Sequence, residues 1–170
     1  MFAPMISLEK VRKQPIWCCI KNQTLEPLIG LLAWLFPTMP LAKTAPNTMF
    51  PLMSKEYDDD PLCYQEATRI LVAQQMLQTT AKFMEPGGFD RVTTPYGVFH
   101  SVHDTMTDME GTEAFHERTD NIKGNDKTFF RVGQGLDVDV KLWHNLLREP
   151  GCGAVIDVAL QWIEKRCPGK

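Results

Sequence analysis

The feature that most constrains the fold is an alternation of helix-like and strand-like segments over residues 65–166. From about Gln65 to Met84, apolar residues recur at three- and four-residue spacing, which predicts an amphipathic helix that ends at Pro86-Gly87-Gly88. Residues 92–99 and 128–132 are rich in β-branched and aromatic residues, which predicts two strands. Helices that alternate with strands along a chain are typical of an α/β fold with a parallel sheet.

Two further helices complete this alternation. Thr107-Asp108-Met109-Glu110 matches a capping box, in which the Thr107 hydroxyl accepts a helix N–H and Glu110 reaches back, so we expect a helix from there to about Arg118. A last helix is expected over Val155–Arg166. Its expected core-facing residues are Val155, Ile156, Ala159, Leu160, Trp162 and Ile163.

Residues 1–55 have no comparable pattern. Six prolines from Pro15 to Pro51 divide this region into short pieces and leave room for one helix, at about Leu25–Phe36. No segment of the region alternates like a strand. Met1–Met5 is nevertheless a candidate strand remnant, because a residue before proline prefers extended geometry. The acidic segment that follows, residues 56–64, predicts a solvated turn.

Composition excludes several classes of protein. A chain of 170 residues with 44% hydrophobic residues is long enough to form one domain with a core. Its net charge of −3 and scattered basic residues give no reason to expect nucleic acid or an anionic membrane surface as a partner. The longest apolar run, Leu28–Phe36, is nine residues long, whereas spanning a bilayer takes about 20, so we expect no integral membrane segment.

The cysteines and the chain start indicate a compartment. Five cysteines without metal-type spacing, including adjacent Cys18 and Cys19, predict reduced thiols rather than a disulfide framework. Met1–Leu8 lacks the basic region of a signal peptide. We therefore expect a cytoplasmic protein.

Polar residues that suit hydrolytic chemistry follow the two predicted strands. His100-Ser101-Val102-His103-Asp104 comes after the first strand, and Leu142-Trp143-His144 comes after the second. Functional groups of an open parallel sheet gather at the carboxyl ends of its strands, so Asp104 and His144 are expected on the same rim. There Asp104 would accept the imidazole N–H and fix its tautomer, and the other nitrogen of His144 would take a proton from a nucleophile.

A nucleophile for this pair is absent from the expected setting. The order Asp then His is that of α/β-hydrolases, in which a serine in Gly-x-Ser-x-Gly precedes both. The three serines, Ser7, Ser54 and Ser101, have no flanking glycines. The alternative interpretation is therefore that Asp104 is a solvated loop carboxylate and His144 a semi-buried structural histidine.

We expect neither a metal ion nor a cofactor. His100 and His103 have HxxH spacing, but no further ligand cluster accompanies them. Asp58–Asp60 lacks the alternation and the terminal Glu of an EF-hand loop. Gly133-Gln134-Gly135 and Gly151-Cys152-Gly153 lack the third glycine or the lysine of a phosphate loop.

The order of these motifs resembles the plant-type monoacylglycerol lipase-like α/β-hydrolases, which include caffeoylshikimate esterase-like and lysophospholipase-like members. The matching segments extend through most of the chain. They are Asp60-Pro61-Leu62-Cys63-Tyr64, His100-x-x-x-Asp104, Thr107-Asp108-x-Glu110-Gly111, Asp126-Lys127-Thr128 and Trp143-His144-x-Leu146-Leu147-x-Glu149-Pro150. The resemblance implies a partial α/β-hydrolase domain, the C-terminal portion of the fold. Residues 1–84 would be the core tail and the cap or lid, and residues 85–170 the last strands and helices.

The resemblance implies a serine ester hydrolase that acts on acylglycerol-like lipid esters, with Asp104 and His144 as triad acid and base. The family's nucleophile elbow and oxyanion loop correspond to positions upstream of Met1, so we expect this chain alone to be inactive. The 40 positions between Asp104 and His144 exceed the family's habit, and the extra segment Gly133–Leu142 is expected to displace His144. The alternative is a non-catalytic pseudo-enzyme or interaction module that self-associates through an exposed sheet edge.

Overall fold

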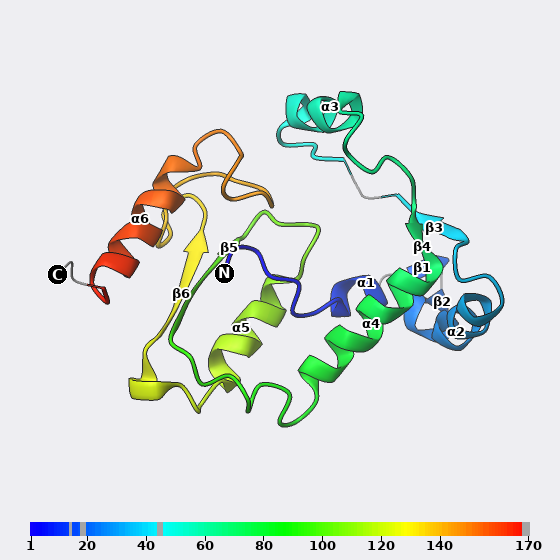
Figure 1. Ribbon diagram of the computed structural model, residues 1–170, viewed down its shortest axis with the longest axis horizontal. Helices are drawn as coiled ribbons and strands as arrows, with labels where there is room; N and C mark the ends of the chain where they lie inside the picture. The colour runs from blue at the N-terminus through cyan, green and yellow to red at the C-terminus, as the bar shows by residue number, and fades with distance from the viewer. Residues whose placement is uncertain (14, 18–19, 44–45, 168–170) are drawn as a thin grey trace. The chain divides into compact units, whose positions relative to one another are not determined.

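The computed structural model describes residues 1–13, 15–17, 20–43 and 46–167, and the chain divides into two compact units (Figure 1). The first unit consists of Met1–Ile6 and the chain from Pro86 onward, and the second is Ser7–Glu85. No helix in the described ranges has both the length and the apolar character needed to cross a membrane. Among the described cysteines, Cys63, Cys152 and Cys167, no disulfide is formed, and Cys18 and Cys19 lie outside the described residues.

The elements of the first unit alternate between strand and helix. In chain order they are β5 (Tyr96–Ser101), α5 (Met109–Arg118), a 3₁₀ turn η2 (Lys123–Asn125), β6 (Lys127–Val132) and α6 (Gly153–Glu164). β5 and β6 pair in parallel with an unbroken register, from Tyr96 opposite Lys127 to Ser101 opposite Val132. The predicted parallel arrangement is therefore confirmed.

Single bridges extend this pair on both sides. Phe2 forms a parallel bridge with Phe99 of β5, and the two rings stack with centroids 5.1 Å apart. The predicted strand remnant at the chain start thus lies beside β5. On the other side, Val138 forms a parallel bridge with Val132 of β6.

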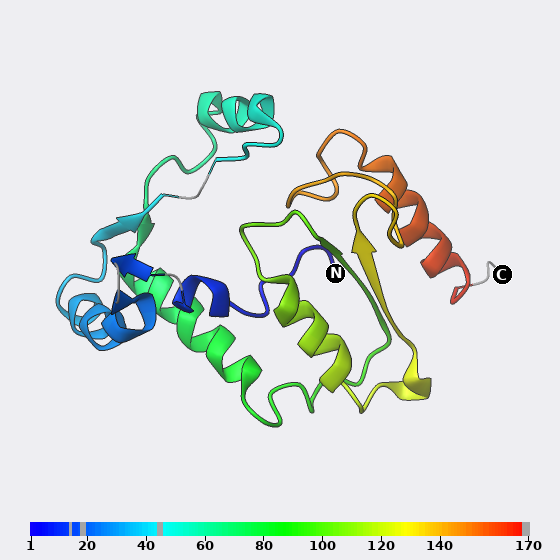
Figure 2. The ribbon, with the colours of Figure 1, turned by 180° about the vertical axis from the view of Figure 1, so that it is seen from behind.

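The two long helices of this unit cover opposite faces of the strand pair (Figures 1 and 2). Successive side chains of a strand point to opposite faces. His100 points toward α5, where its Nδ1 lies 2.7 Å from Thr112 Oγ1. Gly97 lies beneath the Trp162 ring of α6, and a Cβ at this position would approach that ring to 3.3 Å. The glycine therefore lets α6 pack closely on β5.

The N-terminus of α5 differs from the predicted capping box. Asp108 is the N-cap residue, with extended backbone, and its side chain accepts the Glu110 N–H. The Thr107 hydroxyl instead donates to Asp104 Oδ2 at 2.8 Å. A hydrogen bond to an ionised carboxylate is stronger than one between neutral groups, so this contact orients the Thr107 side chain toward Asp104. The prediction of a helix was correct, but the capping residue was wrong by one position.

The core-facing side of α6 was predicted only in part. Val155 is fully buried, whereas Ile156, Leu160 and Ile163 are 37%, 50% and 48% exposed. Trp162 is half-buried, and its Nε1–H donates to Thr128 Oγ1 of β6 at 3.0 Å. The sequence carries two adjacent apolar stripes, and a helix of 3.6 residues per turn lays only one of them on the sheet.

The second unit is built from short elements. In chain order they are α1 (Glu9–Lys13), β1 (Pro15–Trp17), β2 (Ile20–Lys21), a 3₁₀ turn η1 (Asn22–Leu25), α2 (Glu26–Leu35), β3 (Pro40–Ala42), α3 (Pro51–Asp59), β4 (Thr68–Arg69) and α4 (Ile70–Met84). α2 confirms the helix predicted at Leu25–Phe36. The sequence showed no strand-like alternation in residues 1–55 apart from the candidate remnant at Met1–Met5, but two short antiparallel pairs, β1–β2 and β3–β4, involve this region.

Two further boundaries in this unit differ from prediction. The helix expected from Gln65 begins at Ile70, because Thr68–Arg69 pairs with β3 and the Ile70 N–H donates to Met39 O at 2.9 Å. The acidic segment expected to be a turn begins inside α3, which Pro51 starts and which ends at Asp59. Proline is favoured in a first helical turn, because its fixed φ suits the helix and its missing N–H needs no partner there.

Candidate active site

The loop after β5 is organised around the Asp104 carboxylate. The backbone turns back at once, with the Asp104 N–H donating to Ser101 O at 3.2 Å. Asp104 Oδ1 then accepts the backbone N–H groups of Met106 at 2.7 Å and Thr107 at 3.0 Å. Aspartate commonly closes turns in this way, by accepting N–H groups two and three residues ahead. The Asp104 side chain is completely buried, so the turn fixes a carboxylate inside the protein.

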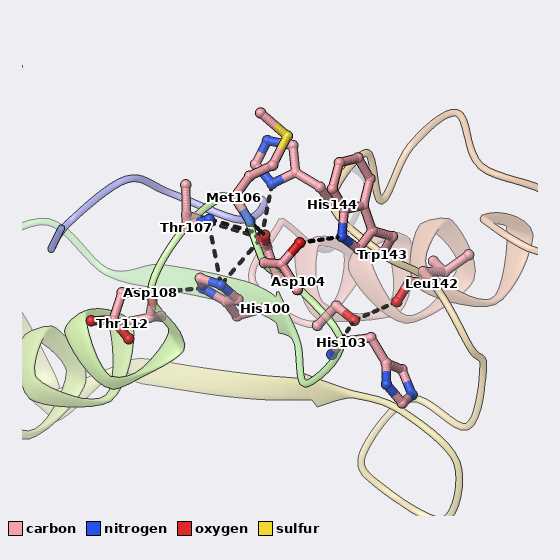
Figure 3. Close-up of polar contacts among 12 residues, drawn as sticks. His100, His103, Asp104, Met106, Thr107, Asp108, Thr112, Leu142, Trp143 and His144 are labelled. Atoms are coloured by element: carbon pink, nitrogen blue, oxygen red, sulfur yellow. Dashed lines mark hydrogen bonds and ion pairs between the residues drawn. The ribbon is translucent and has the colours of Figure 1, made fainter. Parts of the chain in front are cut away.

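Two histidines lie at the other oxygen of this carboxylate (Figure 3). His144 Nδ1 is 2.8 Å from Asp104 Oδ2, and His100 Nε2 is 3.4 Å from the same atom. Because an ionised carboxylate only accepts hydrogen bonds, His144 Nδ1 and His100 Nε2 both act as donors to it. The His100 side chain is fully buried, whereas 28% of the His144 side chain is exposed. Of the two, His144 is therefore the histidine that solvent or a substrate can reach.

The protonation of the pair follows from these contacts. Burial raises the pKa of the Asp104 carboxyl, but the hydrogen bonds from His100, His144 and Thr107 outweigh this and leave the pKa well below its usual range. The pKa of His144 is raised, chiefly by its hydrogen bond to Asp104, against the lowering effect of burial. The carboxylate thus stays ionised and stabilises a protonated imidazole beside it.

The loop that carries His144 is tied to the Asp104 loop at two further points. The Ser101 hydroxyl donates to Leu142 O at 2.5 Å, and the Trp143 Nε1–H donates to Thr105 Oγ1 at 2.9 Å. Leu142 and Leu146, on either side of His144, are 0% and 1% exposed. Two loops that lie far apart in the sequence are therefore joined at the carboxyl edge of β5 and β6.

The segment Gly133–Leu142 does not displace His144, contrary to the expectation from its length. It folds back beside β6, where Gly133 N–H donates to Val138 O at 3.0 Å. Within this segment, Asp137 accepts the N–H of Arg131 in β6 and Asp139 accepts the Gly135 N–H, both at 2.9 Å. The extra residues therefore form a local turn beside β6, and His144 still reaches Asp104.

Three residues of the site escaped the sequence interpretation. His100 was considered only for its HxxH spacing and as part of the motif that ends at Asp104, but its side chain contacts the Asp104 carboxylate. Thr112, a buried hydroxyl on α5, orients His100 and carries no recognisable signal in the sequence. Glu149 is fully buried below the His144 loop. The sequence signal for Glu149 was its place in the family motif that begins at Trp143-His144.

Removal of the Thr112 hydroxyl tests the orientation of His100. In Thr112→Val the shape is kept, but His100 Nδ1 loses its partner, so we expect a loss of about 1–3 kcal/mol in the free energy of unfolding. Urea unfolding measures this. The control is Thr79→Val, at an exposed position of α4, for which we expect a change within about 0.5 kcal/mol. Equal effects of the two substitutions would contradict the assigned contact.

The raised pKa of His144 predicts a pH dependence of stability. The stabilisation is fully present below the unfolded-state pKa of histidine, about 6.5, and is lost as pH rises through the higher folded-state pKa. Wild type should thus exceed His144→Gln in unfolding free energy most at about pH 5, and the difference should shrink toward about pH 9. His103→Gln is the control, since the hydrogen bond that anchors His103 comes from its backbone N–H. A difference that is constant over this pH range would refute the prediction.

Two solved structures that are similar to this chain are named as lipases. The chain is similar to a monoacylglycerol lipase from Paleococcus ferrophilus, with a TM-score of 0.61, 20% identity, and coverage of 95% of this chain and 56% of that chain. It is also similar to a soluble variant of monoglyceride lipase from Saccharomyces cerevisiae in complex with a substrate analog, with a TM-score of 0.59, 18% identity, and coverage of 85% and 50%. The chain spans about half the length of these structures. The comparison with curated proteins finds no match.

The helices and the parallel strand pair are thus part of an α/β-hydrolase fold. The family model described as serine aminopeptidase, S33, matches residues 1–151, which include both Asp104 and His144. The chain belongs to this family of α/β-hydrolases. The resemblance inferred from the motifs is confirmed for fold and family.

Proposed function

We propose that this protein is a serine ester hydrolase of the monoacylglycerol lipase type and that Asp104 and His144 are the acid and base of its triad. The observation that carries the proposal is the 2.8 Å contact between His144 Nδ1 and the buried Asp104 carboxylate, at the carboxyl edge of a parallel strand pair. Lipid esters are proposed as substrates because the two solved structures compared above are named as lipases.

The contact suits general acid–base catalysis. Asp104 holds the imidazole through Nδ1–H, which leaves Nε2 to take the proton of a serine hydroxyl as that oxygen attacks the ester carbonyl. The imidazolium is stabilised by the ionised carboxylate, and it then returns the proton to the departing alcohol. A water molecule then attacks the acyl-serine ester, and the imidazole takes a proton from this water. The proton passes to the serine oxygen as the fatty acid is released. Proton transfer by a positioned side chain contributes about 10²–10⁴-fold to such a rate.

None of the three serines in this sequence is suited to be the nucleophile. The Ser101 hydroxyl is buried and donates to Leu142 O, and it also accepts the His103 N–H. In the second unit, Ser7 Oγ accepts the Glu9 N–H and Ser54 Oγ accepts the Asn47 N–H. Catalysis by this mechanism therefore needs a serine in Gly-x-Ser-x-Gly that these 170 residues do not contain. We propose that they supply the acid, the base and the cap.

A cap role for the second unit, Ser7–Glu85, is supported by the surface of α2. Four large apolar side chains on this helix are exposed: Leu28 by 50%, Leu31 by 52%, Trp34 by 78% and Leu35 by 49%. Exposed apolar patches mark ligand or interaction surfaces. Such a surface suits contact with the acyl chain of a lipid ester.

The reading frame immediately upstream of Met1 and an assay of the chain together test the proposal. We expect that the 170 residues alone neither react with a fluorophosphonate probe nor hydrolyse p-nitrophenyl butyrate. An in-frame Gly-x-Ser-x-Gly segment is expected upstream, and the extended protein should hydrolyse a monoacylglycerol. His144→Ala should lower that rate at least about 10²-fold, whereas the control His103→Ala should not. Absence of the segment would instead favour the non-catalytic interaction module.

A further inference from the structure

We infer that Glu149 is a positioning residue of this site: its buried carboxylate holds the backbone of the His144 loop so that the imidazole stays on Asp104. The inference rests on the proposed function, since it assigns Glu149 a role through the proposed base.

The Glu149 carboxylate accepts three successive backbone N–H groups. Its Oε2 accepts the Trp143 N–H at 2.5 Å, and its Oε1 accepts the N–H groups of His144 at 3.0 Å and Asn145 at 2.8 Å. Consecutive N–H groups that converge in this way form a concave anion-binding site in the backbone. Here the anion is a side chain of the same loop, four to six residues further along the chain.

The loop folds back on itself to make this possible. Leu146 N–H donates to His144 O at 3.0 Å, and Glu149 N–H donates to Asn145 O at 3.1 Å. These turns return the chain so that the Glu149 side chain lies under residues 143–145. Glu149 is 0% exposed, and a buried carboxylate requires strong donors to offset its loss of hydration. The carboxylate and the loop conformation therefore depend on each other.

The consequence for His144 is both geometric and electrostatic. One of the three N–H groups belongs to His144 itself, so the carboxylate fixes the backbone from which the imidazole projects toward Asp104. The pKa of His144 is raised mainly by the Asp104 hydrogen bond and against burial, and the charges of Asp104 and Glu149 add to the rise. A residue that only filled space at position 149 would provide neither effect.

Histidine titration by NMR of the 170-residue chain tests the inference. In Glu149→Gln one oxygen becomes an NH₂ group that faces backbone donors, so the loop loses a hydrogen bond and the negative charge together. We expect the pKa of His144 to fall by about 1 pH unit and the low-field Nδ1–H resonance to be lost. The matched control is Glu164→Gln, at an exposed position near the end of α6, which should leave both signals unchanged.

A purely structural role gives a different result. If Glu149→Gln lowers the unfolding midpoint but the folded protein keeps the wild-type His144 titration and the low-field proton, the inference is wrong. Wild-type amide exchange provides the check that needs no variant. The Trp143, His144 and Asn145 amides should exchange at least about 10²-fold more slowly than unstructured amides. Exchange at the unstructured rate would also overturn the inference.

The same titration separates this inference from the proposed function. If Asp104→Asn leaves the pKa of His144 unchanged, the acid–base pair itself is refuted. If Asp104→Asn lowers that pKa and Glu149→Gln does not, the pair stands and only the role of Glu149 fails.

Discussion

Replacement of Asp104 by asparagine should destabilise the folded chain by about 2–4 kcal/mol near neutral pH. The buried carboxylate accepts backbone donors from Met106 and Thr107, the Thr107 hydroxyl and the His144 ring N–H. An amide at this position keeps one oxygen for the two backbone donors, but it directs an NH₂ group at the remaining donors. A buried donor that has no acceptor costs the folded state its full desolvation free energy.

The pH dependence of this loss has a defined sign. The folded-state pKa of Asp104 is depressed, so its stabilisation is complete above the unfolded-state pKa of about 3.9 and is lost as pH falls through the folded-state pKa. The difference between wild type and Asp104→Asn should therefore shrink below about pH 4, as measured by urea unfolding. Asp137→Asn is the control, because exposed Asp137 accepts a backbone N–H that an amide oxygen can still accept. A loss for Asp104→Asn no larger than for this control would contradict the account.

Leu146→Ala should cost about 2–5 kcal/mol of unfolding free energy, whereas the neighbouring Leu147→Ala should cost less than about 1 kcal/mol. Leu146 is 1% exposed and fills the core beneath the His144 loop, and Leu147 is 44% exposed. Truncation of the first leaves a cavity, while truncation of the second removes side-chain atoms that are partly in water. The pair is matched in residue type, substitution and chain position.

Urea unfolding of both leucine variants at one pH measures this contrast. Equal losses would show that the loop is not packed as described. A large loss for Leu147→Ala alone would place the opposite side of the loop in the core, and would then also put the Glu149 contacts in error.

Parts of the fold were predictable because they depend on local pattern. The two strands of the first unit and their parallel pairing follow from the order of helix-like and strand-like segments and from β-branched composition. The errors arose where tertiary contacts decide. α4 begins at Ile70 because residues 68–69 pair with β3, and no signal in the helix pattern reveals that pairing. The exposed stripe of α6 was assigned to the core for the same reason.

Of the site, the positions of Asp104 and His144 were predictable, and the residues that support them were not. Asp104 and His144 follow strands whose carboxyl ends share an edge, so their proximity is a topological expectation, and the structure places them in contact. The residues that support this pair were not predictable. The contact between His100 and Thr112 joins side chains 12 positions apart in the sequence and depends on how α5 packs on β5. The contacts of Glu149 depend on how the loop after His144 turns back on itself. Periodicity and spacing carry no information about either.

The tautomer of His144 is the most direct test of the central claim, that Asp104 and His144 form an acid–base pair. ¹⁵N chemical shifts of the imidazole, measured above its pKa, distinguish the two neutral forms. We expect a proton on Nδ1, donated to Asp104, and an unprotonated Nε2 that is able to accept a proton. A proton on Nε2, with Nδ1 bare, would contradict the claim, because that form has no acceptor for the proton of a nucleophile.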